Sequence, residues 1–217
     1  MFEKIKQDPY IIKLYEQIEL LEQDGELWHN HSSLHINNVI KTVEDVLIKL
    51  NYNQEIIEMA KIAALLHDIG CAYGKDNHAE KSYQLAKEYF ENNDIKTSDN
   101  EMVLEAIKLH SGKETTNNFI AKVLIFADKI DIKGDRITNA GKKIPVVKES
   151  QHIEDIIIEI NDQELIVNFV ANKKINKTDL DTFYFLPKIF KAIKGFASEL
   201  DLKAKILFNE ETWIIKE

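Results

Sequence analysis

Three features are scarce in this 217-residue sequence: cysteine, positive charge and long apolar runs. Because Cys71 is the single cysteine, the chain cannot build an intrachain disulfide framework. No apolar run approaches the roughly 18 residues of a membrane-spanning helix, and the charged N-terminus carries no secretory signal. We therefore expect a cytoplasmic protein with no membrane partner.

The charge balance also excludes a class of partner. Lys and Arg number 28 against 37 Asp and Glu, which gives a net charge of -9. Such a chain is poorly suited to grip a nucleic-acid polymer through its phosphate backbone. A small phosphorylated substrate is compatible with this balance, because local cations or metals can hold it. Hydrophobic residues make up 44% of the chain, enough to build an ordinary globular core.

Apolar residues recur at helical spacing through the first 145 residues or so. They predict six helices, over about 8–24, 33–50, 54–68, 77–91, 100–110 and 117–133. We find no internal repeat, low-complexity tract or long linker in this part of the chain.

The pattern changes after Gly141. Residues 155–160 and 165–170 are rich in Ile and Val and predict a hairpin, and 203–208 and 212–215 predict a second pair of strands. Between the pairs, 179–200 has helical periodicity, and Pro187 should kink that helix or mark its true start. The sequence thus predicts a mainly α protein, with a helical domain over 1–145 and a small α+β (ββαββ) appendage over 146–217. Strand edges need cover, so we expect a homodimer or packing of the appendage on the helices.

Several polar side chains lie on helix faces that should point inward. They include four of the seven histidines: His35, His67, His78 and His110. Asp128 follows Leu124 by one turn on a helix whose buried side is otherwise aliphatic, and an unpaired carboxylate there would cost several kcal/mol. Burying these groups separately, together with Asp68, requires several independent polar networks, whereas one metal centre satisfies them all. The His67-Asp68 pair alone is more typical of an ordinary helix end than of a metal site.

Four motifs resemble the HD-domain superfamily of metal-dependent phosphohydrolases, over roughly residues 30 to 135. They are His35-Ile-Asn-Asn-Val39, Leu-Leu-His67-Asp68-Ile-Gly, Lys-Leu-His110-Ser-Gly and Phe-Ala-Asp128-Lys129. Members of that superfamily are helical bundles, so the resemblance implies an HD-type bundle for the first domain.

The resemblance also implies a set of metal ligands. His35, His67 and Asp128 would hold a first metal, Asp68 would bridge, and His78 and His110 would hold a second. This pattern looks like the two-metal subset, which includes cyclic-dinucleotide phosphodiesterases, symmetrical diadenosine-tetraphosphatases and a few di-iron oxygenases. Mixed nitrogen and oxygen ligation suits Fe, Mn, Zn, Co or Ni without choosing among them. His31 is an alternative to His35 as the first ligand.

We therefore expect a phosphohydrolase that cleaves a nucleotide or other small phosphate ester with a metal-activated water. Asp68 and Lys129 are the expected catalytic residues, the latter because the resemblance places a lysine there. Lys75, Lys113 and Arg136 are candidate substrate contacts. Arg136 is the only arginine in the chain, which indicates a need for a planar bidentate donor, toward a phosphate or toward Asp131 or Asp135.

Two other functions remain open, and one nearby residue has no assigned chemistry. The same ligands occur in di-iron oxygenases, and a non-catalytic nucleotide-sensing protein could keep a structural metal. Cys71 is expected to be a small packing residue, since no partner that would activate it is identifiable.

Overall fold

The computed structural model describes residues 1–23, 28–112 and 115–215. The chain divides into two compact units, one formed by Met1–Asp24 and His31–Asp128 and the other by Gly25–Asn30 and Lys129–Glu217. The sequence predicted a domain boundary after residue 145, whereas the main part of the second compact unit begins at Lys129. Two independent domains divided at residue 145 stay a prediction. Within the described ranges no helix is long and apolar enough to cross a membrane.

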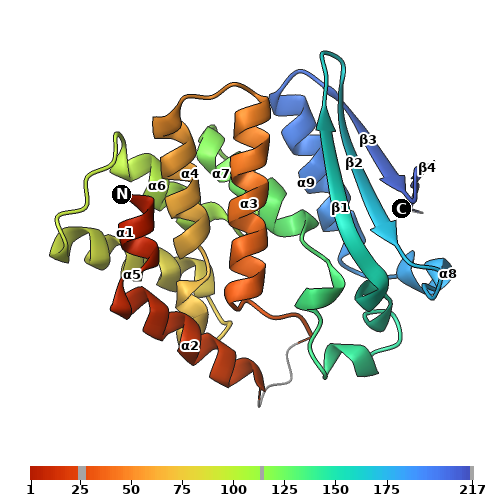
Figure 1. Cartoon of the computed structure of the whole chain (residues 1–217), viewed down its shortest axis with the longest axis horizontal. Coiled ribbons are helices and arrows are strands. Elements are labelled where there is room, and N and C mark those ends of the chain that lie inside the picture. Colours follow the sequence, from red (N-terminus) through yellow and green to blue (C-terminus); the bar gives the residue numbers. More distant parts are fainter. Residues whose placement is uncertain (24–27, 113–114, 216–217) are drawn as a thin grey trace. The chain divides into compact units, whose positions relative to one another are not determined.

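The first unit is built from helices (Figure 1). Their bounds are α1 Phe2–Lys6, α2 Pro9–Gln23, α3 Ser33–Lys49, α4 Gln54–Leu66, α5 His78–Asn92, α6 Asn100–Leu109 and α7 Phe119–Ile130, the last of which ends two residues into the second unit. The side chains of Asn53 and Asp99 cap α4 and α6 by accepting a backbone N–H at each N-terminus. The six predicted helices are confirmed, and the short α1 is an addition.

Small residues let the helices around α4 approach it closely. Ala60, Ala63 and Ala64 are fully buried on α4, which packs against both α3 and α6. Figure 1 shows α3 and α4 side by side, with the first turn of α3 near the end of α4. This packing brings together the two helix ends that carry His35 and His67.

After α4 the chain makes a 3-10 turn, η1 (Ile69–Tyr73), which packs against α5. The Gly70 N–H donates to the Ser82 hydroxyl at 2.8 Å. A Cβ atom at Gly70 would collide with the backbone of His78 and of Ser82. Glycine is therefore needed for the close approach that positions the first turn of α5.

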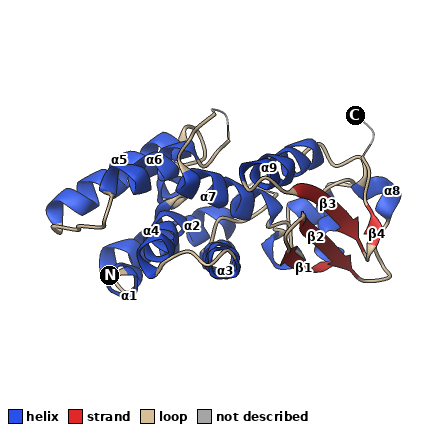
Figure 2. Cartoon of the chain, turned by 90° about the horizontal axis from the view of Figure 1, so that it is seen from above, coloured by secondary structure: helices blue, strands red, loops and turns tan. Residues whose placement is uncertain are grey.

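The second unit contains a four-stranded sheet with helices α8 (Lys177–Leu180) and α9 (Leu186–Glu199). Its strands are β1 (Ile153–Ile160), β2 (Glu164–Ala171), β3 (Lys203–Phe208) and β4 (Glu211–Thr212), in the order β1-β2-β3-β4. The outer pairs are antiparallel and β2 runs parallel to β3, so the connection between those two must cross over. Helices α8 and α9 lie in that crossover, and α9 packs on β2 and β3 (Figure 2). The mainly α fold class with a ββαββ appendage is confirmed.

Two predicted elements differ in their bounds. The helical run over 179–200 is divided into α8 and α9, with an interruption between them, so a continuous helix kinked at Pro187 is excluded. Pro187 occupies the first turn of α9 and marks its true start, where a missing N–H costs nothing. The last strand is Glu211–Thr212 instead of 212–215.

Candidate metal centre

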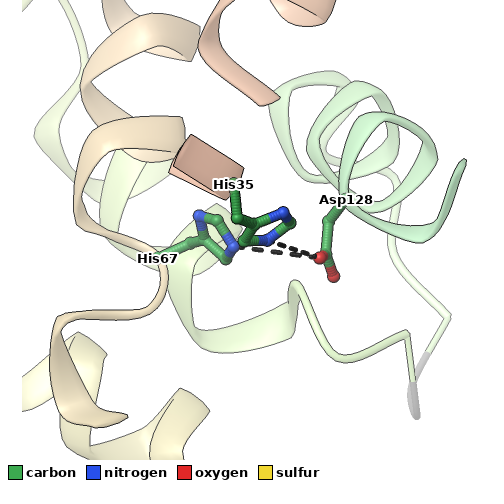
Figure 3. Close-up of side chains that lie close together, drawn as sticks. All are labelled: His35, His67 and Asp128. Atoms are coloured by element: carbon green, nitrogen blue, oxygen red, sulfur yellow. Dashed lines mark ion pairs between the residues drawn. The ribbon is translucent and has the colours of Figure 1, made fainter. Parts of the chain in front are cut away.

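The ends of three helices in the first unit supply a group of buried ligand atoms. His35 lies in the first turn of α3, His67 follows the last residue of α4, and Asp128 lies near the end of α7. Both imidazoles are fully buried, and Asp128 is 5% exposed. Figure 3 shows the three side chains pointing toward one another. His35 Nε2 lies 3.2 Å from Asp128 Oδ1, and His67 Nε2 lies 3.9 Å from the same oxygen.

Asp68 lies between this group and a second one. Its Oδ2 atom is 3.2 Å from His67 Nε2 and 3.7 Å from His35 Nε2. Its Oδ1 atom is 3.3 Å from His110 Nε2 and 3.6 Å from His78 Nε2. The two carboxylate oxygens of Asp68 therefore face different pairs of histidines, an arrangement that lets one carboxylate bind two cations.

Backbone carbonyls determine which nitrogen three of these histidines present. Nδ1 of His67, His78 and His110 lies 2.8, 2.9 and 2.7 Å from the carbonyl oxygen of the residue three positions earlier. A carbonyl can only accept, so Nδ1 carries the proton in each neutral ring and Nε2 keeps its lone pair. This is the pattern by which outer partners orient metal-binding histidines.

The residues fit a metal, because their lone pairs converge without enough donors. His78 Nε2 and His110 Nε2 lie only 3.1 Å apart, and two bare lone pairs at that distance repel unless a cation or a proton lies between them. No described residue makes a hydrogen bond of good geometry to His67 Nε2, although the atom is buried and Asp68 Oδ2 lies nearby. Ligand atoms of His35, His67 and Asp128 lie within 4.8 Å of one another, and so do those of His67, Asp68 and His110.

The electrostatics also favour a cation at this place. Burial alone would raise the pKa of Asp68, but the neighbouring His67 outweighs it and holds that pKa well below its usual range. Burial would lower the pKa of His67, yet the charges of Asp68 and Asp128 raise it overall. Burial lowers the pKa of His110, which therefore stays neutral and able to bind a metal. Asp68 is therefore an anionic carboxylate beside the neutral His110, a pair of groups that can bind a cation.

His31, the alternative first ligand, has a different environment. Its Nδ1 lies 2.9 Å from Glu22 Oε1, and its backbone N–H donates to the same oxygen at 2.5 Å. Its ring packs edge-on against His35 with centroids 6.0 Å apart. His31 belongs to none of the convergent ligand groups found among the described residues, whereas His35 does. The geometry favours His35.

Two of the three lysines predicted to act in substrate binding or catalysis lie among the described residues, in different surroundings. Lys75 is exposed and lines a cavity of about 440 Å³ with Asn77, His78 and Ser111. Lys113 lies outside the described residues. Lys129 is half-buried on α7 directly after Asp128, as the first residue of the second unit.

Arg136 is buried within the second unit and holds its backbone together. Its Nη1 donates to the carbonyl oxygen of Asp131 at 2.7 Å, and its Nε donates to that of Asn30 at 3.1 Å. The backbone N–H of Asn30 in turn donates to the carbonyl of Arg136. These bonds favour the structural explanation for the only arginine.

Cys71 has a closer relation to the centre than the sequence suggested. Its Sγ lies 3.8 Å from Asp68 Oδ1, and ligand atoms of Asp68, Cys71 and His78 lie within 4.8 Å of one another. Burial and the nearby Asp68 charge raise the pKa of the Cys71 thiol, so it is protonated beside that carboxylate. The three-residue spacing from Asp68 was the available signal, because residues three apart lie on one side of a helical turn.

The comparison with family models agrees with the motifs. The family model of the HD domain matches residues 33–164, more than half of the chain. No curated protein sequence matches the chain. Among solved structures, the chain is similar to a predicted HD superfamily hydrolase from an uncultured Thermotogales bacterium. The two are 19% identical, the match covers 69% of this chain and 89% of the other, and the TM-score is 0.42.

Proposed function

Because this chain belongs to the HD domain family, we propose that it is a metal-dependent phosphohydrolase that cleaves a nucleotide or another small phosphate ester. The observation that supports this best is the arrangement around Asp68. Its two oxygens face separate pairs of imidazole nitrogens, three of which are fixed as lone-pair donors by backbone carbonyls.

We propose one or two divalent transition metals, from among Fe, Mn, Zn, Co and Ni, as the cofactor. His35, His67 and Asp128 would hold one, His78 and His110 the other, with Asp68 bridging them. Two such ions polarise phosphate oxygens and lower the pKa of a bound water enough for it to attack phosphorus near neutral pH. The protein fixes the rings through their Nδ1 bonds, and burial of His35, His67 and Asp68 keeps bulk water from these ligands.

The cavity beside His78 is the proposed place for the rest of the substrate. It is lined by Lys75, Asp76, Asn77, His78, Ala79 and Ser111. The side chains of Lys75, Asn77 and Ser111 can donate hydrogen bonds to an anionic or hydroxylated group. Lys75 would supply positive charge beside the acidic Asp76. Roles for Lys113 and Lys129 in binding and catalysis stay predictions from the sequence, as does a phosphate contact by Arg136.

The experiment is a metal-reconstitution assay. Metal-free protein is reloaded with each of the five metals in turn and offered nucleoside phosphates, dinucleotides and simple phosphate esters. We expect inorganic phosphate or a nucleotide product with at least one metal, loss of turnover on chelation, and recovery on adding the metal back.

Two results would overturn the proposal. Oxygen consumption with an organic substrate and an iron centre, without phosphate ester cleavage, would make the protein a di-iron oxygenase. Tight nucleotide binding without turnover under every metal would make it a sensor with a structural metal. An oxygen electrode and equilibrium binding measurements on the same preparations separate these outcomes.

A further inference from the structure

The Cys71 thiol lies where a further ligand to the proposed second metal would be. We infer that Cys71 binds this metal as a thiolate, together with Asp68, His78 and His110. The position would then combine nitrogen, oxygen and sulfur donors, unlike the position at His35, His67 and Asp128. This inference rests on the proposed metal site and assigns a residue that the family motifs do not include.

The local backbone directs the thiol toward Asp68. Asp68 caps the 3-10 turn η1, and Cys71 follows it by three residues. Residues three apart eclipse one another in a 3-10 helix, so these two side chains share a side of the turn. The backbone N–H of Cys71 donates to the Asp68 carbonyl at 2.9 Å, which closes the turn and fixes this relation.

The distances between ligand atoms suit one metal ion. Metal–nitrogen, –oxygen and –sulfur bonds of about 2.0–2.3 Å place tetrahedral ligand atoms about 3.3–3.6 Å apart. Asp68 Oδ1 lies 3.8 Å from Cys71 Sγ, 3.6 Å from His78 Nε2 and 3.3 Å from His110 Nε2. The two imidazole nitrogens are 3.1 Å apart. Each distance is within a few tenths of an ångström of the tetrahedral spacing.

Two further observations point to a ligand at this place. Cys71 is only 6% exposed and lies beside the Asp68 carboxylate and the His78 imidazole. His110 is buried, and its Nε2 lies 3.1 Å from His78 Nε2, although each ring uses its Nδ1–H on a backbone carbonyl and therefore presents a lone pair. A cation between these two nitrogens, Asp68 and Cys71 would meet the need of the two lone pairs.

Thiolate ligation would make the two metal positions chemically different. As the metal–sulfur bond forms, the thiol proton passes to solvent, so the ligand arrives as an anion. A soft thiolate favours Zn, Fe or Co over Mn, whereas histidine and carboxylate ligands accept all of them. The second position should therefore bind Zn or Co in preference to Mn.

Titration of the metal-free protein with Co²⁺, followed by absorption spectroscopy, tests this inference without any substrate. We expect a thiolate-to-cobalt charge-transfer band in the near ultraviolet, which Cys71 alone can produce because it is the only cysteine. Cys71→Ser and Cys71→Ala should abolish the band and weaken binding of the second cobalt ion by about tenfold or more. His152→Ala, a histidine of the second unit, is the matched control and should change neither.

The outcomes separate this inference from the proposed function. Two bound cobalt ions without a charge-transfer band would overturn Cys71 as a ligand and leave the two-metal site intact. An unchanged band in Cys71→Ser would do the same. No bound cobalt at all would overturn the metal site, and the inference with it. The wild-type spectrum decides the question even if the variants do not fold.

Discussion

Individual hydrogen bonds determine what the site histidines can do. His67, His78 and His110 each donate Nδ1–H to the carbonyl three residues earlier, which is available because each residue stands at or beside a helix end. The helix geometry thereby fixes the tautomer, and Nε2 is the atom offered to the centre. Replacing any of these histidines with alanine would leave the carbonyl oxygen three residues earlier without this hydrogen-bond donor.

His35 and His31 provide a comparison of two neighbouring histidines. His35→Ala removes a fully buried group that faces Asp68 and Asp128, so we expect the loss of one bound metal and a fall in turnover of at least about 100-fold. His31→Ala removes the ring contacts to Glu22 and His35 but none of the candidate ligand atoms, so it should keep its metal content. Elemental analysis of both purified variants, with circular dichroism to check the fold, makes the comparison. Equal metal loss in the two variants would contradict the assignment.

The sequence selected the candidate ligands by type and face, but it did not predict all of their surroundings. His35, His78 and His110 could be selected because polar groups on apolar helix faces need partners. Cys71 was not selected, because a cysteine without an activating partner is expected to be a packing residue. Arg136 was also ambiguous, since a sequence cannot show that its donors are used by carbonyls of Asn30 and Asp131.

At the level of secondary structure, periodicity located the long helices and the strands. It failed where local chemistry overrides the pattern: Pro187 starts α9 because it cannot donate within a helix, and the apolar run before it is interrupted. The five residues of α1 are too few for a periodic signal. The close contact between η1 and α5 could not be predicted either, because Gly70 resembles an ordinary helix stop.

Gly70→Ala tests whether that contact positions a ligand. The added methyl group would meet the backbone of His78 and Ser82, so α5 must shift away from η1. We expect destabilisation of about 1–3 kcal/mol from overpacking, together with weaker binding of the second metal. Urea unfolding and metal titration measure the two effects. Gly195→Ala is the matched control, because a Cβ there meets no atom within 4 Å. Unchanged metal affinity in Gly70→Ala would show that this contact does not position His78.

A hydrogen bond between the start of α2 and α5 predicts a dependence on alkaline pH. The Tyr89 hydroxyl donates to Asp8 Oδ2 at 2.9 Å, and burial together with this carboxylate raises the pKa of Tyr89. The resulting stabilisation is complete below the unfolded pKa of about 10 and is lost as pH rises through the higher folded pKa. Tyr89→Phe should therefore cost about 1 kcal/mol near neutral pH and progressively less above about pH 10. Urea unfolding of both proteins across this range measures the difference, and a constant difference would contradict it.

At the scale of the whole molecule, all six candidate ligands lie within the first compact unit. Metal binding should stabilise that unit, because the unfolded chain cannot bring these ligands together. At a free metal concentration about 100 times the Kd, the gain is about 2.7 kcal/mol, or a rise in Tm of about 5–10 °C. Thermal melts with metal and with chelator measure it. Identical melting curves in the two conditions would show that no metal binds the folded state preferentially.

Composition predicted the broad class of the molecule, but not its assembly. The excess of acidic over basic residues predicts that the chain does not bind a nucleic-acid polymer, and this stays a prediction. The second unit presents β1 at one edge of its sheet, which is the basis on which the homodimer was expected. That assembly stays a prediction, since self-association depends on surface complementarity that no periodic pattern encodes.

The central claim is that Asp68 joins two metal positions into one hydrolytic centre. Metal content and phosphate ester turnover of wild-type protein and Asp68→Ala, measured on the same preparations, test it most directly. We predict that Asp68→Ala keeps the helical circular dichroism spectrum but loses bound metal and turnover together. Undiminished hydrolysis by Asp68→Ala would contradict the account.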